Sequence, residues 1–159
     1  MHIRKAGLPK DILKKINLYR DKDLAEIKKI RVRWARGATR QYPRRSSDRL
    51  LYVNLENLIK LADFGEMMYV PLNPRQLFTG VDERDFRVAM ILDRWNKEGA
   101  IDPPELGLNH LGQISFGNGR HRTITAFHLG EEEIPVEIDL SHIEIIGKLI
   151  DLRNHKKKS

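Results

Sequence analysis

Two glycines, two arginines and a histidine lie within the six residues 117–122, a combination that is typical of a loop that binds an anion. Guanidinium groups stay charged at physiological pH, and each can donate two parallel hydrogen bonds to a phosphate. Imidazole titrates near neutral pH, so a histidine beside them can move a proton. The residue types therefore predict a phosphate-binding loop. The alternative is an ordinary turn that carries two exposed arginines.

The sequence on both sides of this loop predicts a strand before it and a helix after it. Residues 114–116 are typical of a short strand, and residues 123–129 carry apolar side chains at helical spacing. Gly130 suits the position just beyond a helix end. A helix that begins at the loop would direct free backbone N–H groups and the positive end of its dipole at the anion.

Each residue of the loop has an expected role. Arg120 and Arg122 are expected to contact phosphate, and Asn118 to orient a ribose or a phosphate through its amide. His121 is a candidate general acid or base, with phosphate contact and a hydrogen bond inside the turn as alternatives. The hydroxyl of Thr123 reaches either the same anion or a local backbone carbonyl. The predicted phosphate- or nucleotide-binding residues are Gly117, Asn118, Gly119, Arg120, Arg122 and Thr123.

The composition limits the other chemistry that this chain can carry. The 159 residues include no cysteine, which excludes disulfides, thiolate chemistry and zinc held by cysteine. The histidines show no i,i+4 pairing within one expected helix, so no metal site is predicted. No apolar run approaches the ~20 residues of a membrane span, and the N-terminus does not resemble a signal peptide. A cytoplasmic protein without a membrane partner is expected.

The positive charge is concentrated in the first third of the chain. Residues 1–49 have a net charge of +11, whereas residues 50–159 have a net charge of −4. Clustered cations interleaved with Trp34 and Tyr42 favour contact with a nucleic-acid backbone, with DNA expected first. A solvated helix face, an acidic protein partner and an anionic membrane surface are the alternatives. The predicted nucleic-acid-binding residues are Lys28, Lys29, Arg31, Arg33, Arg36, Arg40, Arg44 and Arg45.

The spacing of apolar residues divides the chain into two parts, a basic helical N-terminal segment (1–49) and a domain (50–159). The first part is expected to hold one helix from Pro9 through Leu18, a second over 23–34, and a mobile basic linker over 37–47. In the second part strands and helices alternate, which predicts a compact mixed α/β (α+β) fold with a small mixed sheet. Strands are expected at 50–53, 67–72, 114–116 and 134–138, and helices at 55–62, 83–98, 123–129 and beyond 141. The expected helix caps are Asn54, Asp82 and Ser141, with Gly99 ending the second of these helices.

Residues 68–139 resemble the ParB/sulfiredoxin-like domain. The resemblance rests on the order and spacing of several short motifs, more than on any one of them. These are Tyr69-Val70-Pro71-Leu72, a helix ending at Gly99, Asp102-Pro103-Pro104, the loop 117–122, Leu129-Gly130 and Ile134-Pro135-Val136. The resemblance implies a nucleotide or phosphate pocket at the loop, with ATP or CTP and Mg²⁺ as cofactors. From their places in the family layout, Glu98 and Asp102 are the candidate catalytic carboxylates, beside His121.

Two departures from the family narrow the expected function. Arg120 stands where sulfiredoxins carry their catalytic cysteine, and little sequence follows residue 139 for the helix-turn-helix region of segregation proteins. The best fit is a small nucleotide-dependent DNase or ATPase of the ParB-like nuclease type, as found on mobile genetic elements. The alternative is a non-catalytic DNA- or nucleotide-binding regulatory module. A small-molecule kinase is a weaker third option, because such an enzyme would not need the basic segment.

Overall fold

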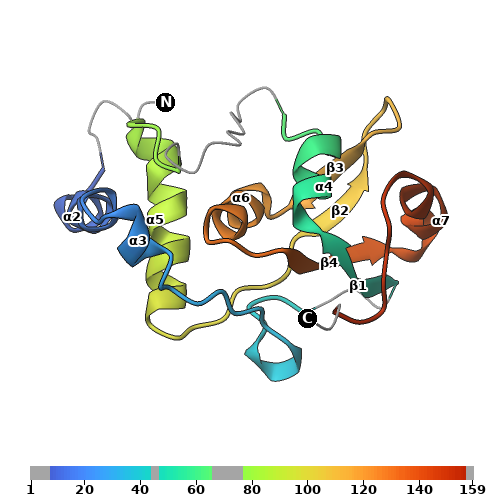
Figure 1. Ribbon diagram of the computed structural model, residues 1–159, viewed down its shortest axis with the longest axis horizontal. Helices are drawn as coiled ribbons and strands as arrows, with labels where there is room; N and C mark the ends of the chain where they lie inside the picture. Colours follow the sequence, from blue (N-terminus) through green and yellow to red (C-terminus); the bar gives the residue numbers. More distant parts are fainter. Residues whose placement is uncertain (1–7, 44–46, 66–76, 157–159) are drawn as a thin grey trace.

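The computed structural model describes residues 8–43, 47–65 and 77–156 and shows a mixed α+β fold (Figure 1). The sheet formed by these described residues has four strands in the order β1-β4-β2-β3. β4 is antiparallel to β1 and parallel to β2, and β2 is antiparallel to β3. The predicted small mixed sheet is therefore confirmed. The strands are β1 (Asp48–Asn54), β2 (Glu105–Leu108), β3 (Ile114–Asn118) and β4 (Glu133–Asp139).

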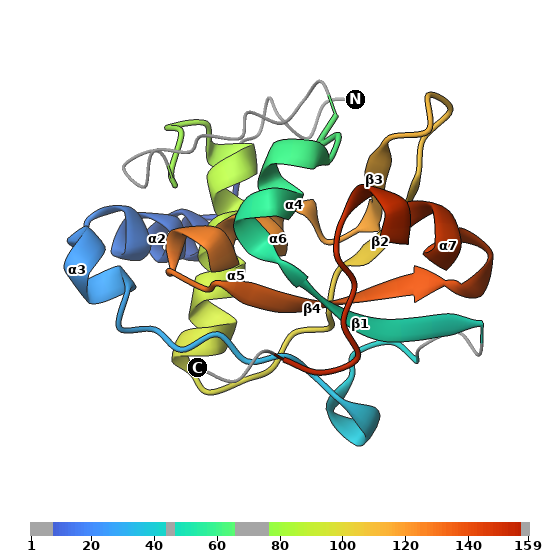
Figure 2. The same cartoon turned by 45° about the vertical axis from the view of Figure 1, so that its right-hand side comes forward.

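The helices lie in a row that leads from the N-terminal segment to the far end of the sheet (Figures 1 and 2). α2 packs on α5, α5 packs on α6, and α7 covers β2 and β4. In the described part of the chain none of the helices is long and apolar enough to cross a membrane. The helices are α2 (Lys10–Arg20), α3 (Leu24–Ile27), α4 (Leu55–Leu61), α5 (Asp82–Asn96), α6 (Arg120–His128) and α7 (Leu140–Leu149), with a 3₁₀ turn η1 (Gly37–Thr39).

One hydrophobic core joins the two parts of the chain. β4 is central in the sheet, so its six residues from Glu133 to Ile138 are all buried. The same core cluster takes in Ile16 and Tyr19 of α2 and Trp95 of α5. Tyr19 is 1% exposed, whereas the neighbouring Leu18 is 53% exposed. The hydrophobic core therefore continues across the predicted boundary between residues 49 and 50.

The expected helix over 23–34 is wrong beyond its first turn. α3 ends at Ile27, and the chain is extended where it reaches Trp34. Ile101 donates its N–H to the carbonyl of Arg33 (3.0 Å) and accepts the N–H of Ala35 (2.8 Å). Pairing with this distant segment satisfies the backbone groups that a longer helix would have used.

Part of the expected linker over 37–47 is bonded to the domain in the described residues. Both terminal nitrogens of Arg40 bind the Glu137 carboxylate, at 2.7 and 2.9 Å. The Asp102 carboxylate accepts the backbone N–H groups of Gln41 (2.8 Å) and Tyr42 (2.9 Å). Buried acidic groups therefore fix residues 40–42, here called the 40–42 segment.

Most expected strands and helices are confirmed, with local corrections at their ends. The Asn54 side chain caps α4 by accepting the N–H of Asn57, as expected. Asp82 lies inside α5 instead of capping it, and binds Arg20 at 2.7 Å. At the start of α7 the capping side chain is Asp139, which accepts the N–H of Ser141. The strand expected at 67–72 lies outside the described residues.

Candidate anion-binding site

Gly119 makes the turn between β3 and α6, and no other residue fits there without strain. Its φ is +97°, in the left-handed region that side chains disfavour. A Cβ at this position would lie 2.6 Å from Cβ and 2.7 Å from Cα of Pro104. Gly117 has no such constraint, because a Cβ there would lie 3.5 Å from a Glu105 carboxylate oxygen, an ordinary contact. Close approach of the backbone thus depends on Gly119.

The helix behind the turn begins three residues earlier than expected, so the two arginines and the histidine form its first turn. α6 starts at Arg120, and Gly119 is its N-cap residue. The first N–H groups of a helix have no acceptor within it and carry the positive end of the dipole. The Thr123 hydroxyl donates to the Gly119 carbonyl at 2.7 Å and Thr123 is fully buried. Of the two alternatives for Thr123, the structure therefore shows the local backbone bond.

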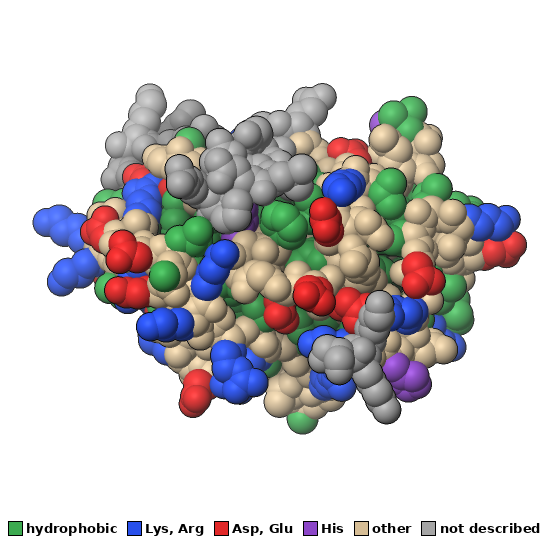
Figure 3. Space-filling model, viewed as in Figure 1, with side chains coloured by type: hydrophobic (Ala, Val, Ile, Leu, Met, Phe, Trp, Pro, Cys, Tyr) green, Lys and Arg blue, Asp and Glu red, His purple; other side chains and the backbone are tan. Residues whose placement is uncertain are grey.

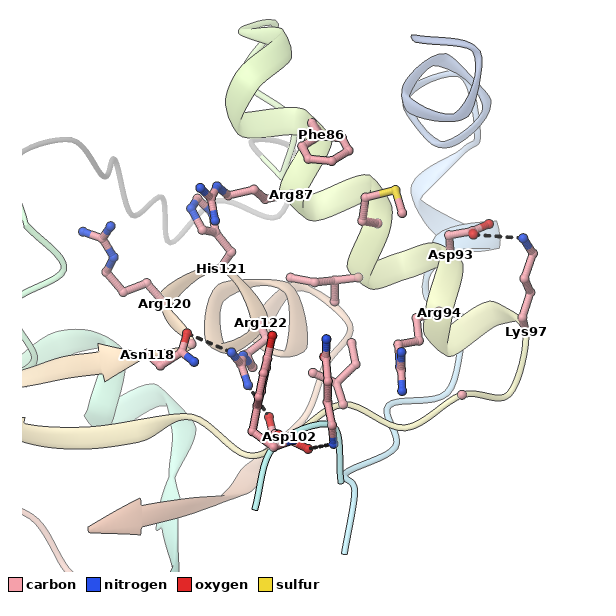
Figure 4. Close-up of a pocket in the computed structure, with 17 residues that line it drawn as sticks. Phe86, Arg87, Asp93, Arg94, Lys97, Asp102, Asn118, Arg120, His121 and Arg122 are labelled. Carbon is pink, nitrogen blue, oxygen red and sulfur yellow. Dashed lines mark hydrogen bonds and ion pairs between the residues drawn. The ribbon is translucent and has the colours of Figure 1, made fainter. Parts of the chain in front are cut away.

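A pocket of about 670 Å³ opens beside this first turn (Figure 4). Its other walls come from α5, from the corner at 99–102 and from the 40–42 segment. The volume lies within the range of small-molecule sites, about 300–1,000 Å³. The charged side chains that line the pocket are Arg87, Asp93, Arg94, Lys97, Asp102, Arg120 and Arg122, together with the imidazole of His121.

The pocket is electropositive because, among the described residues, five Lys and Arg side chains line it against two carboxylates, and both carboxylates are already bonded to protein groups. Asp93 pairs with Lys97 (3.0 Å) and Lys15 (3.2 Å) and accepts the Tyr19 hydroxyl at 2.9 Å. Asp102 is held by backbone N–H groups of the 40–42 segment. Five Lys and Arg side chains line the same space. Their charge is thus only partly balanced within the pocket, which favours an anionic ligand.

Arg120 and Arg122 are fixed in different ways. Arg122 Nη1 donates to the Asp102 carbonyl (2.7 Å), and its Nη2 donates to Oδ1 of Asn118 (2.9 Å). Burial lowers the pKa of the Arg122 guanidinium from its ordinary value, and the nearby carboxylate of Asp102 opposes this effect. Arg120 Nη1 donates to the Phe64 carbonyl at 2.8 Å. Asn118 therefore orients an arginine within the site.

His121 lies against the arginines and points toward Arg87 of α5 (Figure 4). Its pKa is lowered from 6.5 to about 4, first by burial and then by the charges of Arg87, Arg120 and Arg84. The imidazole is consequently neutral at pH 7 and can accept a proton or a hydrogen bond. A bound anion would offset the arginine charges and raise this pKa.

The two candidate carboxylates have different places. Asp102 lines the pocket, although its carboxylate is already bonded to the 40–42 segment. Glu98 is outside the pocket lining, its side chain is 81% exposed, and it lies 3.7 Å from Arg33. Among the described residues there is no cluster of three or more His, Asp or Glu side chains that could hold a metal ion.

The predicted nucleic-acid-binding residues do not form one uniform surface. Lys28, Lys29 and Arg31 are exposed, whereas Arg40 is held in its pair with Glu137. In Figure 3 the Lys and Arg side chains gather at the end with α2 and α3 and along the lower edge, with acidic groups between them. Of the remaining residues, Arg33 pairs with Glu98, Arg36 donates to the Tyr52 hydroxyl, and Arg44 and Arg45 lie outside the described residues.

The sequence interpretation missed the wall that α5 supplies. Arg87, Met90, Arg94 and Lys97 all line the pocket and follow one another at intervals of three or four residues. That spacing places them on one helix face. The helical spacing of Arg87, Arg94 and Lys97 was the signal that could have found them. Gln41 and Tyr42 carried no such signal, because they reach the pocket from the segment expected to be mobile.

Comparisons with protein-family models, with curated proteins and with solved structures found no match for this chain. The resemblance to the ParB/sulfiredoxin-like domain therefore stays a prediction from its motifs.

Proposed function

We propose that this protein binds a nucleotide or a related phosphorylated ligand in the pocket between α5 and α6, and contacts nucleic acid through its basic N-terminal segment. One observation carries the first part. The first turn of α6 and five Lys or Arg side chains converge on one pocket whose two carboxylates are bonded to protein groups. The motif resemblance to nucleotide-binding domains supports the same ligand class.

In this proposal the phosphate oxygens accept hydrogen bonds from the first N–H groups of α6 and from the guanidinium of Arg120. Arg87 adds charge from the opposite helix. Arg122, with two bonds to the protein, holds the Asp102 corner against α6. ATP and CTP are the nucleotides to test, and Mg²⁺ would enter with their phosphates, since Mg²⁺ commonly binds through substrate phosphates with one or two carboxylates.

The placement of the carboxylates favours the binding module over the enzyme. Glu98 is outside the pocket lining, and Asp102 already accepts two backbone N–H groups. A specific observation keeps the nucleotide-dependent DNase or ATPase as the second candidate. His121 is neutral at pH 7 inside the pocket, which is the state that a general base requires. Hydrolysis of ATP or cleavage of DNA that His121→Asn abolishes would favour the enzyme.

The nucleic-acid part of the proposal is supported by the exposed cations of the N-terminal segment. Lys28, Lys29 and Arg31 follow one another closely after α3 and all are exposed. Cations of this kind bind phosphate backbones by releasing counterions, so the binding should weaken steeply with salt.

The test separates the two surfaces. Calorimetry with ATP, CTP, GTP and ADP, with and without Mg²⁺, is run beside binding of labelled single- and double-stranded DNA. Arg120→Ala and Arg87→Ala should weaken nucleotide binding and leave DNA binding intact. A triple variant with Lys28, Lys29 and Arg31 changed to Ala should do the reverse. Lys148→Ala removes one charge from an exposed side chain of α7 and is the control for the two single-arginine variants.

Two results would count against this function. If none of the nucleotides binds, the pocket is not a nucleotide site. If Arg120→Ala and the triple variant both reduce DNA binding equally, the first turn of α6 belongs to the nucleic-acid surface instead.

A further inference from the structure

The pocket contains an aromatic wall that lies outside the region of family resemblance. Tyr42 lines the pocket, yet its side chain belongs to the exposed large hydrophobic residues, at 62% exposed. The 40–42 segment supplies it from the N-terminal part of the chain. Aromatic side chains of this kind offer a face on which a nucleobase can stack.

The backbone beneath this ring is fixed on both sides. The Tyr42 N–H donates to Asp102 Oδ2 at 2.9 Å, and its carbonyl accepts from Arg40 Nε at 2.9 Å. Arg40 is in turn held by Glu137, whose side chain is 1% exposed. A buried charge network therefore holds the backbone of Tyr42 in place, while its side chain is exposed. Such rigidity lowers the entropy that a ligand contact would cost.

Asp102, which is buried, links the Tyr42 ring to the anion-binding turn. Asp102 binds Tyr42 through its carboxylate and Arg122 of α6 through its carbonyl (2.7 Å). The aromatic wall and the cationic end thus share one support. Apolar side chains from α5, namely Phe86, Met90 and Ile91, line the pocket as well. A phosphate ion has only five heavy atoms, so it would leave most of the 670 Å³ unfilled.

We propose that Tyr42 is the base-stacking residue of this pocket, so that its ligand is a nucleotide whose base lies on the Tyr42 ring while its phosphates lie at the first turn of α6. This inference rests on the proposed function and names its ligand class more closely. Stacking on an aromatic side chain is worth enough that replacing the ring by alanine should weaken binding by about 5- to 150-fold.

The experiment compares a ligand with a base and one without. Kd values are measured by calorimetry for ATP, CTP and inorganic tripolyphosphate with the native chain, Tyr42→Ala and Tyr42→Phe. Of ATP and CTP, the one that the native chain binds more tightly should lose affinity for Tyr42→Ala by the stated factor. The affinity for tripolyphosphate should not change. Tyr42→Phe keeps the ring and should bind like the native chain. Since the side chain is exposed, neither variant removes a core contact.

Three outcomes overturn this inference. Equal affinity for tripolyphosphate and both nucleotides, unaffected by Tyr42→Ala, removes the base contact but leaves the phosphate site standing. Equal weakening of all three ligands by Tyr42→Ala would show a structural role for the side chain. Loss of single-stranded DNA binding in Tyr42→Ala, with nucleotide binding intact, would assign the ring to nucleic acid. Failure of every ligand to bind would instead remove the proposed function itself.

Discussion

Two constraints require glycine at position 119, a left-handed backbone conformation and close packing against Pro104. Its φ of +97° opposes any side chain, and a Cβ added there would lie only 2.6 Å from Pro104. Gly119→Ala should therefore lower the free energy of unfolding by at least about 2 kcal/mol, from left-handed strain and the clash. Gly117→Ala is the matched control and should stay within about 1 kcal/mol. Urea denaturation of both variants checks this, and equal losses would contradict it.

His121 should couple anion binding to proton uptake. Its pKa is about 4 in the free protein because of burial and the neighbouring arginines, and a bound anion raises it. Between these two pKa values the complex binds more protons than the free protein, so affinity should increase as pH falls from 8 to 5. Sulfate is a suitable probe because it does not titrate in this range.

Calorimetry with sulfate across this pH range measures the effect. His121→Asn should remove most of the pH dependence while leaving the affinity at pH 8 within a few-fold of the native value. The same pH dependence in both proteins would show that another group takes up the proton.

At the scale of elements, the 40–42 segment depends on its buried ion pair. Arg40→Ala would leave the Glu137 carboxylate, which is 1% exposed, without its bidentate partner. Removing one member of such a pair typically costs about 3–5 kcal/mol of stability. Arg31→Ala removes the same charge from an exposed site and should cost less than about 0.5 kcal/mol. Thermal unfolding of the two variants distinguishes a fixed segment from a loose one, for which both losses would be small.

The elements that the sequence predicted well are those with strong local signals. Asn54 caps α4 by its own side chain, and Gly130, at φ +88°, ends α6. The strands at 114–118 and 133–139 also follow from their apolar spacing. The extended chain at Trp34 did not follow, because its partner Ile101 lies far away in the sequence. The hydrogen bonds from Gln41 and Tyr42 to Asp102 likewise join segments that are about 60 residues apart, so no local pattern predicts them.

The sequence predicted the loop of the candidate site, but it did not predict the residues from α5 and from the 40–42 segment that line the rest of the pocket. Residues 118–122 do line one pocket, as the glycines and arginines indicated. Glu98 was expected near it from its place in the family layout, at the end of the helix that precedes Gly99. In the structure Glu98 itself takes the left-handed conformation that ends α5, at φ +66°, and its side chain points to Arg33. The backbone conformation at the end of a helix therefore decides whether a side chain faces the site, and sequence spacing does not predict that conformation.

For the whole molecule, buried histidine should make stability depend on pH. His128 is 1% exposed, neither ring nitrogen has a hydrogen-bond partner among the described residues, and burial lowers its pKa to about 4. The unfolded chain takes up a proton near pH 6.5 while the folded chain does not, so stability falls as pH drops from 7 to 5. His128 alone should contribute a loss on the order of 2 kcal/mol.

The measurement is the free energy of unfolding in urea at pH 7 and pH 5. His128→Leu should lose distinctly less stability over this interval than the native chain, whatever its stability at pH 7. The lowered pKa of Asp139, about 2, places its titration below this window, so that carboxylate does not interfere. An unchanged pH dependence in His128→Leu would assign the effect to other groups, among them His121.

The position of β4 has a consequence for the order in which the protein can assemble during synthesis. β1 has β4 as its sheet neighbour, and residues 48–54 pair with residues 133–139, about 80 residues later. At about 5–20 residues per second, a ribosome needs roughly 4–16 s to add that stretch. During that interval the hydrogen-bonding edge of β1 has no partner strand. Newly made chains are thus open to other contacts until residues 133–139 emerge.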